Sequence, residues 1–266
     1  MISKNSIGLI RSLEQKKARD KYGLFLAEGD KICSDLLTSD IPVKAVYFTR
    51  QWALENESLL NKQPGSAELM EVSETELGKI SLLTTPNKVL AMAYQQKSAF
   101  SWDMLKTGPV VLIDQVQDPG NLGTIIRTAD WFGFHTIVAA PGTVDFYNPK
   151  VIQSAMGSAF RVMHFKYDLE TLLRENLEKD RWPVYATTLG GENLYSQRLE
   201  KKGFYLFGNE ANGISQVLQT LAGSHIVIPQ GPVQNGKQPA DSLNVAVAAA
   251  VVMAEFARQE IAQLNG

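Results

Sequence analysis

Cysteine and histidine are scarce in this sequence, and their scarcity excludes two kinds of site. The 266 residues include one cysteine, Cys33, so no disulfide can form within the chain. The three histidines, His135, His164 and His225, are scattered and do not form the closely spaced cluster that a metal site needs. We therefore expect no metal cofactor. The scarcity of cysteine fits a reducing compartment, and we expect a cytoplasmic location.

Long apolar runs are also lacking. No stretch of about 18 apolar residues occurs, so no transmembrane helix is expected. The longest candidate, residues 245–254, is short and rich in alanine, which is typical of a buried helix. Residues 1–17 lack the continuous apolar core of a secretory signal. We expect no interaction with a membrane.

A strong charge of either sign is missing too. The formal net charge is −2, whereas a strongly basic chain would point to nucleic acid by composition alone. Residues 1–21 nevertheless carry more basic than acidic side chains. The basic ones are Lys4, Arg11, Lys16, Lys17, Arg19 and Lys21, against Glu14 and Asp20. Two interpretations stay open, namely a solvated amphipathic helix and an edge that contacts phosphates.

Patterns of apolar residues divide the chain near residues 97–108. The part before this break predicts a small α/β unit. Its expected strands are residues 24–27, 43–48 and 89–94, and a helix follows the first of them to about residue 38. Ser73 and Glu76 have the spacing of a capping box, which predicts a helix over residues 74–82.

The part after the break alternates more regularly between strands and helices. The expected strands are residues 110–113, 136–139, 161–165, 184–187, 204–207 and 226–228. The expected helices are residues 121–132 and 168–180 and a long final helix from Ser242. Continuous apolar strands separated by helices indicate a parallel sheet covered on both faces. Ligands of such sheets bind beyond the carboxyl ends of the strands.

The first polar loop, residues 118–129 (DPGNLGTIIRTA), joins a strand to a helix. Asn121 is a good N-cap type. Arg127 lies two turns into the helix, on roughly the same face as Gly120 and Thr124. A guanidinium there suits bidentate contact with phosphate. Taken alone, this segment is more typical of an ordinary turn followed by a surface arginine.

Two further segments follow later strands. Residues 206–215 (LFGNEANGIS) hold Glu210 between two glycines, and they match neither a phosphate-binding P-loop nor a dinucleotide fingerprint. Residues 228–248 include Ser242, a second N-cap candidate, and Asn244 within the expected first turn. Small side chains after Asn244 allow another backbone to pack closely. Each segment is ambiguous in isolation.

The three segments together, in this order, resemble the SpoU/TrmH family of RNA 2′-O-ribose methyltransferases within the SPOUT superfamily. The resemblance covers about residues 108–260. Residues 24–37 (LFLAEGDKICSDLL) more weakly resemble the L30-like substrate-binding domain that precedes the catalytic domain in some members. We therefore expect an L30e-like RNA-binding domain over residues 1–100 and a SPOUT methyltransferase domain over residues 108–266.

The resemblance implies an α/β catalytic domain with a parallel sheet and a deep trefoil knot. It also implies S-adenosylmethionine as methyl donor and an active site at a homodimer interface. The L30-like domain and the basic start favour large-subunit (23S-type) ribosomal RNA as the partner. Contacts to the donor carry over to Leu189, Gly190, Gly208, Ile228 and Leu243, with Leu189 and Gly190 in a loop after the strand at 184–187.

Catalytic positions implied by the resemblance are Asn121, Arg127, Glu210, Ser242 and Asn244. Arg127 is expected to bind the RNA phosphate and favour the alkoxide, while the identity of the proton acceptor stays open. Asn121, Ser242 and Asn244 lack a useful basic pKa and are interpreted as positioning groups. Glu210 is a candidate salt-bridge partner for Arg127.

One departure and several alternatives remain. The stretch between Pro229 and Ser242 is longer than this family suggests, which makes it a candidate lid or target contact. The same chemistry on tRNA, or on a base atom, is one alternative. Another is an RNA-binding or ribosome-assembly protein without catalysis. A dinucleotide-dependent enzyme is disfavoured because its phosphate fingerprint is missing.

Overall fold

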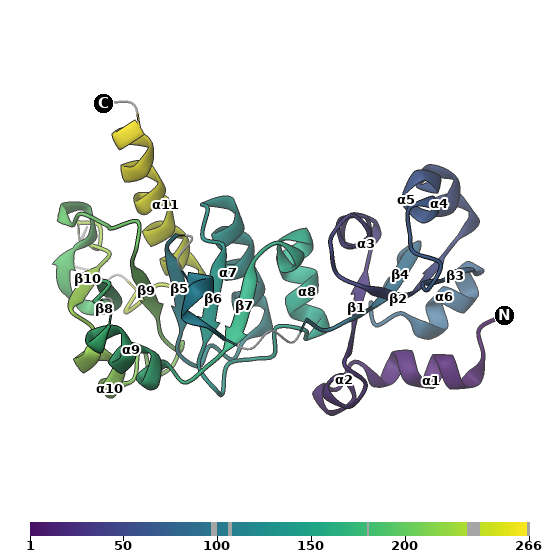
Figure 1. Ribbon diagram of the computed structural model, residues 1–266, viewed down its shortest axis with the longest axis horizontal. Helices are drawn as coiled ribbons and strands as arrows, with labels where there is room; N and C mark the ends of the chain where they lie inside the picture. The colour runs from purple at the N-terminus through teal and green to yellow at the C-terminus, as the bar shows by residue number, and fades with distance from the viewer. Residues whose placement is uncertain (97–99, 106–107, 180, 233–239, 265–266) are drawn as a thin grey trace. The chain divides into compact units, whose positions relative to one another are not determined.

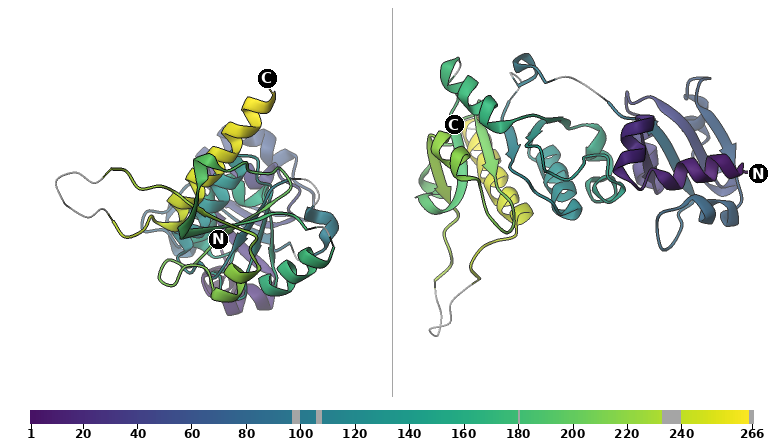
Figure 2. Two further views of the ribbon diagram at one scale, coloured as in Figure 1. Left: turned by 90° about the vertical axis from the view of Figure 1, so that its left-hand side faces the viewer. Right: turned by 90° about the horizontal axis from the view of Figure 1, so that it is seen from below.

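The computed structural model describes residues 1–96, 100–105, 108–179, 181–232 and 240–264, and the chain divides into two compact units (Figures 1 and 2). Unit 1 comprises Met1–Lys97 and a returning segment, Asp145–Arg161. Unit 2 comprises Ser98–Val144 and Val162–Gly266. The apolar pattern indicated the break near residue 97 but not the returning segment.

Four strands in the described part of unit 1 form a mixed sheet in the order β1-β4-β2-β3. β4 (Val89–Tyr94) runs antiparallel to both β1 (Leu24–Glu28) and β2 (Val43–Phe48). β3 (Glu68–Glu71) lies parallel to β2. The three strands expected from sequence are confirmed. β3 was missed because its side chains are largely exposed and show no apolar run.

Helices surround this sheet. They are α1 (Lys4–Ser12), α2 (Lys16–Tyr22), α3 (Asp30–Leu37), α4 (Arg50–Glu55), α5 (Glu57–Asn61) and α6 (Glu74–Ile80), with α8 (Pro149–Ala155) and the 3-10 helix η2 (Met156–Phe160) from the returning segment. The expected capping box at Ser73 and Glu76 is confirmed. Cys33 is buried in α3, and burial raises the pKa of its thiol above the ordinary value. A neutral, enclosed thiol is not a nucleophile.

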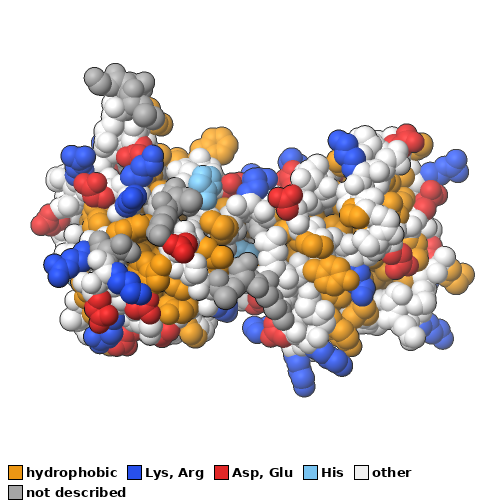
Figure 3. Space-filling view, in the orientation of Figure 1, with side chains coloured by type: hydrophobic (Ala, Val, Ile, Leu, Met, Phe, Trp, Pro, Cys, Tyr) orange, Lys and Arg blue, Asp and Glu red, His pale blue; other side chains and the backbone are white. Residues whose placement is uncertain are grey.

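Some of the basic side chains at the start of the chain make contacts within the protein. Arg19 is 1% exposed and pairs with Asp145 of the returning segment, Nη2 to Oδ2, at 2.7 Å. It also donates to the carbonyls of Leu13 and Glu14, at 2.8 and 2.7 Å. Lys16 pairs with Asp20. On the face shown in Figure 3, basic and acidic side chains are interspersed. Arg19 is thus a structural residue of unit 1 rather than a phosphate contact.

Replacing Arg19 by methionine is expected to destabilise unit 1 by about 3 kcal/mol, because it leaves the Asp145 carboxylate and two carbonyls without their donor. Calorimetric melting of the full chain measures this as a lower Tm of one transition. Lys16→Met is the matched control, since an exposed pair contributes about 0.5 kcal/mol. Equal melting of the two variants would contradict a structural role for Arg19.

Six strands in the described part of unit 2 form one parallel sheet in the order β10-β8-β9-β5-β6-β7. Their bounds are β5 Val110–Ile113, β6 Thr136–Ala139, β7 Met163–Lys166, β8 Val184–Asn193, β9 Phe204–Phe207 and β10 Ser224–Val227. Helices α7 (Pro119–Trp131), α9 (Leu169–Glu178), α10 (Gln216–Leu221) and α11 (Val245–Leu264) accompany it, with the 3-10 helices η1 (Trp102–Leu105) and η3 (Leu194–Ser196). The parallel α/β sheet expected from sequence is confirmed.

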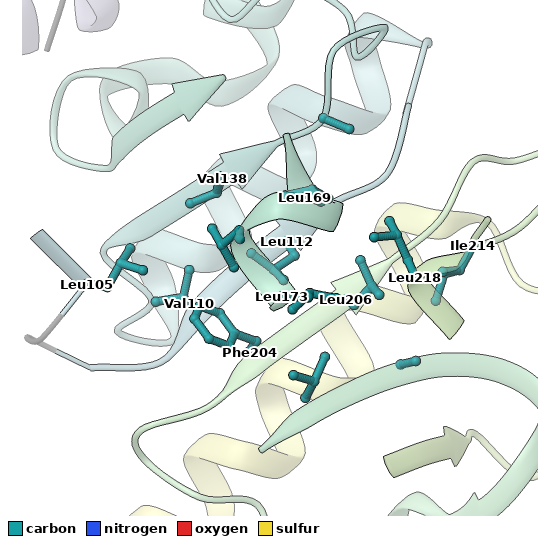
Figure 4. Packing of buried hydrophobic residues seen from close by; sticks show 14 of the residues in the cluster. Leu105, Val110, Leu112, Val138, Leu169, Leu173, Phe204, Leu206, Ile214 and Leu218 are labelled. Atoms are coloured by element: carbon teal, nitrogen blue, oxygen red, sulfur yellow. The ribbon is translucent and has the colours of Figure 1, made fainter. Parts of the chain in front are cut away.

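Both faces of this sheet are covered, which explains its continuous apolar strands. Alternate side chains of the central strands, such as Leu112 and Leu206, pack on one face with Leu173 of α9 and Leu218 of α10 (Figure 4). The side chains between them on the same strands point to the opposite face of the sheet. There, Tyr205 of β9 stacks edge-on against Phe134 and against Phe256 of α11. α7 and α11 pack side by side.

Both helix starts expected in the site region are shifted. Asp118, rather than Asn121, caps α7, because its carboxylate accepts from the Asn121 amide N–H at 2.8 Å and Pro119 takes the first helical position. Asn244, rather than Ser242, caps α11, accepting from the N–H of Ala246 at 2.9 Å. Asp, Asn and Ser are all good caps, so residue type alone does not choose between them.

No helix in the described part of the chain is both long and apolar enough to cross a membrane.

Candidate functional site

Three polar side chains from separate segments of unit 2 meet beyond the carboxyl ends of β5 and β9. Asn121, in the first turn of α7, donates from Nδ2 to Oε1 of Glu210 at 2.7 Å. Asn244, at the start of α11, donates from Nδ2 to Oδ1 of Asn121 at 3.0 Å. These contacts join residues 89 and 123 positions apart in the sequence. The structure therefore brings together one predicted residue from each of the three motifs.

This hydrogen-bonded chain has a defined direction. Oδ1 of Asn244 accepts from the N–H groups of Ala246 and Val247, at 2.9 and 3.4 Å, so its amide nitrogen must face Asn121. Asn121 then offers its own nitrogen to the Glu210 carboxylate. Free N–H groups at the start of α11 thus set the orientation of both amides and direct a donor toward Glu210.

Arg127 lies on α7 with its side chain exposed to solvent. Over the residues that the structure describes, no hydrogen bond or ion pair engages its guanidinium. The expected salt bridge with Glu210 is therefore not formed over these residues, and Oε1 of Glu210 accepts from Asn121. Within the described residues, Arg127 keeps all its donors available to a ligand. Ser242 is also exposed and is not joined to the three-residue chain by any hydrogen bond in the described part.

The turn that carries Glu210 is closed by its backbone. Asn209 and Gly213 exchange N–H···O bonds in both directions at 2.9 Å, forming an isolated β-bridge. A Cβ at Gly208 would lie 2.2 Å from the backbone carbon of Gly213, so only glycine fits there. Gly213 itself has φ +67°, in the left-handed region. Both glycines singled out by the sequence are thus required by close approach or by φ.

Residues expected to contact a donor lie around three adjacent strands, β10, β8 and β9. Gly208 directly follows β9, and Ile228 directly follows β10. Leu189 and Gly190 lie within the bounds of β8, but residues 187–191 are skipped in its register with β10. Ala186 pairs with His225 on one side of the skip, and Glu192 pairs with Ile226 on the other. The expected loop after residue 187 is therefore a bulge inside a longer strand.

The bulge and the start of α11 each expose an apolar side chain. Leu189 in the bulge is 77% exposed, and Leu243 beside the start of α11 is 50% exposed. Thr187 Oγ1 is buried and has no hydrogen-bond partner in the described part of the chain. An orphaned buried hydroxyl calls for an explanation such as an absent ligand.

Sequence reasoning missed Gly191 and Asn209. A Cβ at Gly191 would lie 2.5 Å from the carbonyl oxygen of His225, whereas Gly190, the residue expected to matter, has open space around its Cα. Two consecutive glycines in the sequence indicate a tight approach of the backbone, but they do not indicate which of the two needs the missing Cβ. Asn209 precedes Glu210 in the second motif and bonds the loop after β5.

Chemically, the three-residue cluster offers amide groups and one carboxylate, and α7 also carries the exposed guanidinium of Arg127. Over the described residues, no group of three His, Cys, Asp or Glu side chains is arranged to hold a metal ion. Amides and a guanidinium bind phosphates and hydroxyls, and a carboxylate fixes their orientation. Such a set suits recognition and alignment of a polar, phosphate-bearing substrate.

Family models match both units. Residues 108–254 match the model described as SpoU rRNA Methylase family. Residues 4–91 match the model described as MRM3-like substrate binding domain. The first match spans the three motifs, and the second lies within unit 1.

Relatives and solved structures agree with these matches. A 23S rRNA (guanosine(2553)-2′-O)-methyltransferase of Bacillus subtilis is 31% identical over 244 residues, covering 91% of this chain and 92% of the relative. The structure of a putative RNA methyltransferase of the TrmH family from Porphyromonas gingivalis superposes with a TM-score of 0.85 at 30% identity, covering 97% and 99% of the two chains. The SpoU methyltransferase AviRb from Streptomyces viridochromogenes, in complex with the cofactor AdoMet, gives 0.82 at 25% identity, covering 97% and 99%.

Proposed function

The chain belongs to the SpoU rRNA Methylase family, and we propose that it transfers a methyl group from S-adenosylmethionine to the 2′-hydroxyl of a ribose in ribosomal RNA. The observation that carries this proposal is the chain Asn244–Asn121–Glu210, which unites the three family motifs at one edge of the sheet. A protein that only bound RNA would have no need to keep these groups aligned.

The residues present fit S-adenosylmethionine. At Gly208 and Gly191 main chain packs directly against main chain, with no room for a Cβ, and such loops allow the backbone to approach a donor closely. Leu189 and Leu243 offer exposed apolar contacts, and Thr187 offers a hydroxyl without a partner in the described part of the chain. We assign donor binding to Leu189, Gly190, Gly208, Ile228 and Leu243. When bound, the donor supplies a methyl carbon made electrophilic by the adjacent sulfonium.

The chain's own side chains then align and activate the ribose. A 2′-hydroxyl is a weak nucleophile, so the protein must orient it and favour loss of its proton. We propose that Arg127 binds the neighbouring phosphate and stabilises the developing alkoxide. Asn121 and Asn244 position the nucleotide, with Glu210 fixing Asn121. Ser242 completes the proposed catalytic set from the third motif.

Unit 1 is proposed to select the RNA. Its match to a substrate-binding domain supports this role, and an L30e-like fold with large-subunit rRNA as target is the corresponding expectation. We further propose a homodimer, a trefoil knot in the catalytic domain and a cytoplasmic location, each supported by family membership. RNA is recognised largely through shape and 2′-hydroxyls, so a modest net charge is compatible with this function.

Mapping of 2′-O-methyl groups tests the proposed reaction. Ribosomal RNA from cells with and without the gene is compared, and one ribose is expected to lose its methyl group when the gene is deleted. Purified protein with S-adenosylmethionine should restore that group on RNA from the deletion strain. An unchanged methylation map, together with no transfer in vitro, would support the RNA-binding alternative without catalysis.

Gly208→Ala is expected to weaken S-adenosylmethionine binding at least about 30-fold, because the added Cβ forces the Gly213 backbone away from the turn. Isothermal titration calorimetry of the donor alone measures this without needing RNA. Gly223→Ala is the matched control, since a Cβ there meets nothing within 4 Å. Equal affinities for the two variants would remove Gly208 from the donor site.

A further inference from the structure

Asn209 links two loops of the site through its side chain. Its Nδ2 donates to the carbonyl oxygen of Gln115, in the loop after β5, at 2.7 Å. Its Oδ1 accepts from the N–H groups of Ala211 and Asn212, at 2.8 and 3.3 Å. The backbone of Asn209 is also paired with Gly213. One side chain therefore shapes the Glu210 turn and ties that turn to a different strand.

Gln115 is held in an unusual conformation at this junction. Its φ is +59°, in the left-handed region that residues other than glycine rarely adopt. Such a conformation persists where surrounding contacts determine it, and these sites often serve function. The Asn209 amide donates directly to the Gln115 carbonyl. The preceding residue, Asp114, is 4% exposed and accepts from the Ser215 N–H at 2.7 Å. Residues 114 and 115 thus hold the second motif near both of its ends.

These contacts complete a ring. The polypeptide runs from Gln115 into α7, where Asn121 donates to Glu210. Asn209, the residue before Glu210, donates back to the carbonyl of Gln115. We propose that Asn209 is a positioning residue for methyl transfer, which sets where the Glu210 carboxylate stands relative to Asn121. This inference rests on the proposed function. Asn209 acts through Glu210 and need not touch either substrate.

Asn209→Asp is the sharpest test, because it keeps the acceptor for Ala211 and Asn212 but places an oxygen against the Gln115 carbonyl. We expect kcat to fall about 30-fold, while KM for S-adenosylmethionine stays within about threefold. Asn212→Asp adds the same charge two residues after Glu210 and is the matched control, expected to keep kcat. A control that loses as much activity as Asn209→Asp would overturn the proposal by assigning the effect to loop charge.

A double-mutant cycle with Glu210→Gln separates positioning from general support of the fold. If Asn209 acts through Glu210, then Asn209→Asp costs less than about threefold in kcat once Glu210 is replaced. Multiplicative losses in the cycle would refute the inference. Folding is followed by melting of each full-length variant. A wild-type protein without methyl transfer to any RNA would refute the proposed function, whereas an active wild type with an additive cycle would refute only the role of Asn209.

Discussion

Arg127→Ala is expected to lower kcat for RNA methylation by about 10³- to 10⁴-fold while S-adenosylmethionine still binds. The guanidinium has no partner in the described part of the chain, so its removal disturbs no internal contact there. What the variant loses is therefore contact with the RNA phosphate and stabilisation of the negative charge that develops on the 2′-oxygen. General acid–base and electrostatic effects of this kind contribute rate factors of this size. Methyl incorporation under single-turnover conditions, with donor affinity measured by calorimetry, checks both parts.

The variant Arg127→Lys refines this result. Lys keeps the positive charge but lacks the planar fork that binds phosphate in two places, so an intermediate rate is expected. Arg174→Ala, which removes an exposed arginine of unit 2 that pairs with Glu170, is the matched control and should leave kcat unchanged. Full methyl transfer by Arg127→Ala would contradict the assigned role and direct attention to a group on the RNA as proton acceptor.

Strand positions in this chain were predictable because they depend on local apolar runs. Residues 110–113 and 204–207 are continuous apolar segments, and the structure forms β5 and β9 there. A buried parallel strand needs little beyond such a run and a turn at each end. β3 was not predicted because it is largely exposed and has no apolar run. α8 was not assigned to unit 1 because it packs in a unit whose other residues are distant in sequence.

The site was predictable only as a set of residues. Motif resemblance selected Asn121, Glu210 and Asn244, and the structure joins them. It did not indicate which pairs form, because side-chain direction depends on caps that residue type leaves open. A cap at Asn121 would commit its side-chain oxygen to backbone N–H groups, whereas the cap at Asp118 leaves that oxygen free to accept from Asn244. The expected salt bridge between Glu210 and Arg127 is not formed over the described residues.

The direction of the hydrogen bonds from Asn244 to Asn121 and from Asn121 to Glu210 predicts a second large loss of activity. Aspartate at position 244 still caps α11, and a carboxylate at a helix N-terminus is favourable, so Asn244→Asp is expected to fold as well as the wild type. It cannot donate to Asn121, however. Asn121 must either lose that bond or rotate its amide, which places an oxygen against the Glu210 carboxylate. We expect kcat to fall about 10³-fold, as for removal of a preorganised donor.

Reversing the direction of both hydrogen bonds among Asn244, Asn121 and Glu210 distinguishes an effect of amide orientation from simple loss of a side chain. In the double variant E210Q/N244D, the glutamine introduced at position 210 can donate to a rotated Asn121, which in turn donates to the aspartate introduced at position 244, and the net charge is unchanged. Because every donor again meets an acceptor, we expect the double variant to methylate RNA faster than Asn244→Asp alone, although the carboxylate has moved. Single-turnover rates of the wild type, both single variants and the double variant measure the coupling. Losses that simply multiply would show that the three residues act independently, and the helix start would then have no part in orienting Asn121.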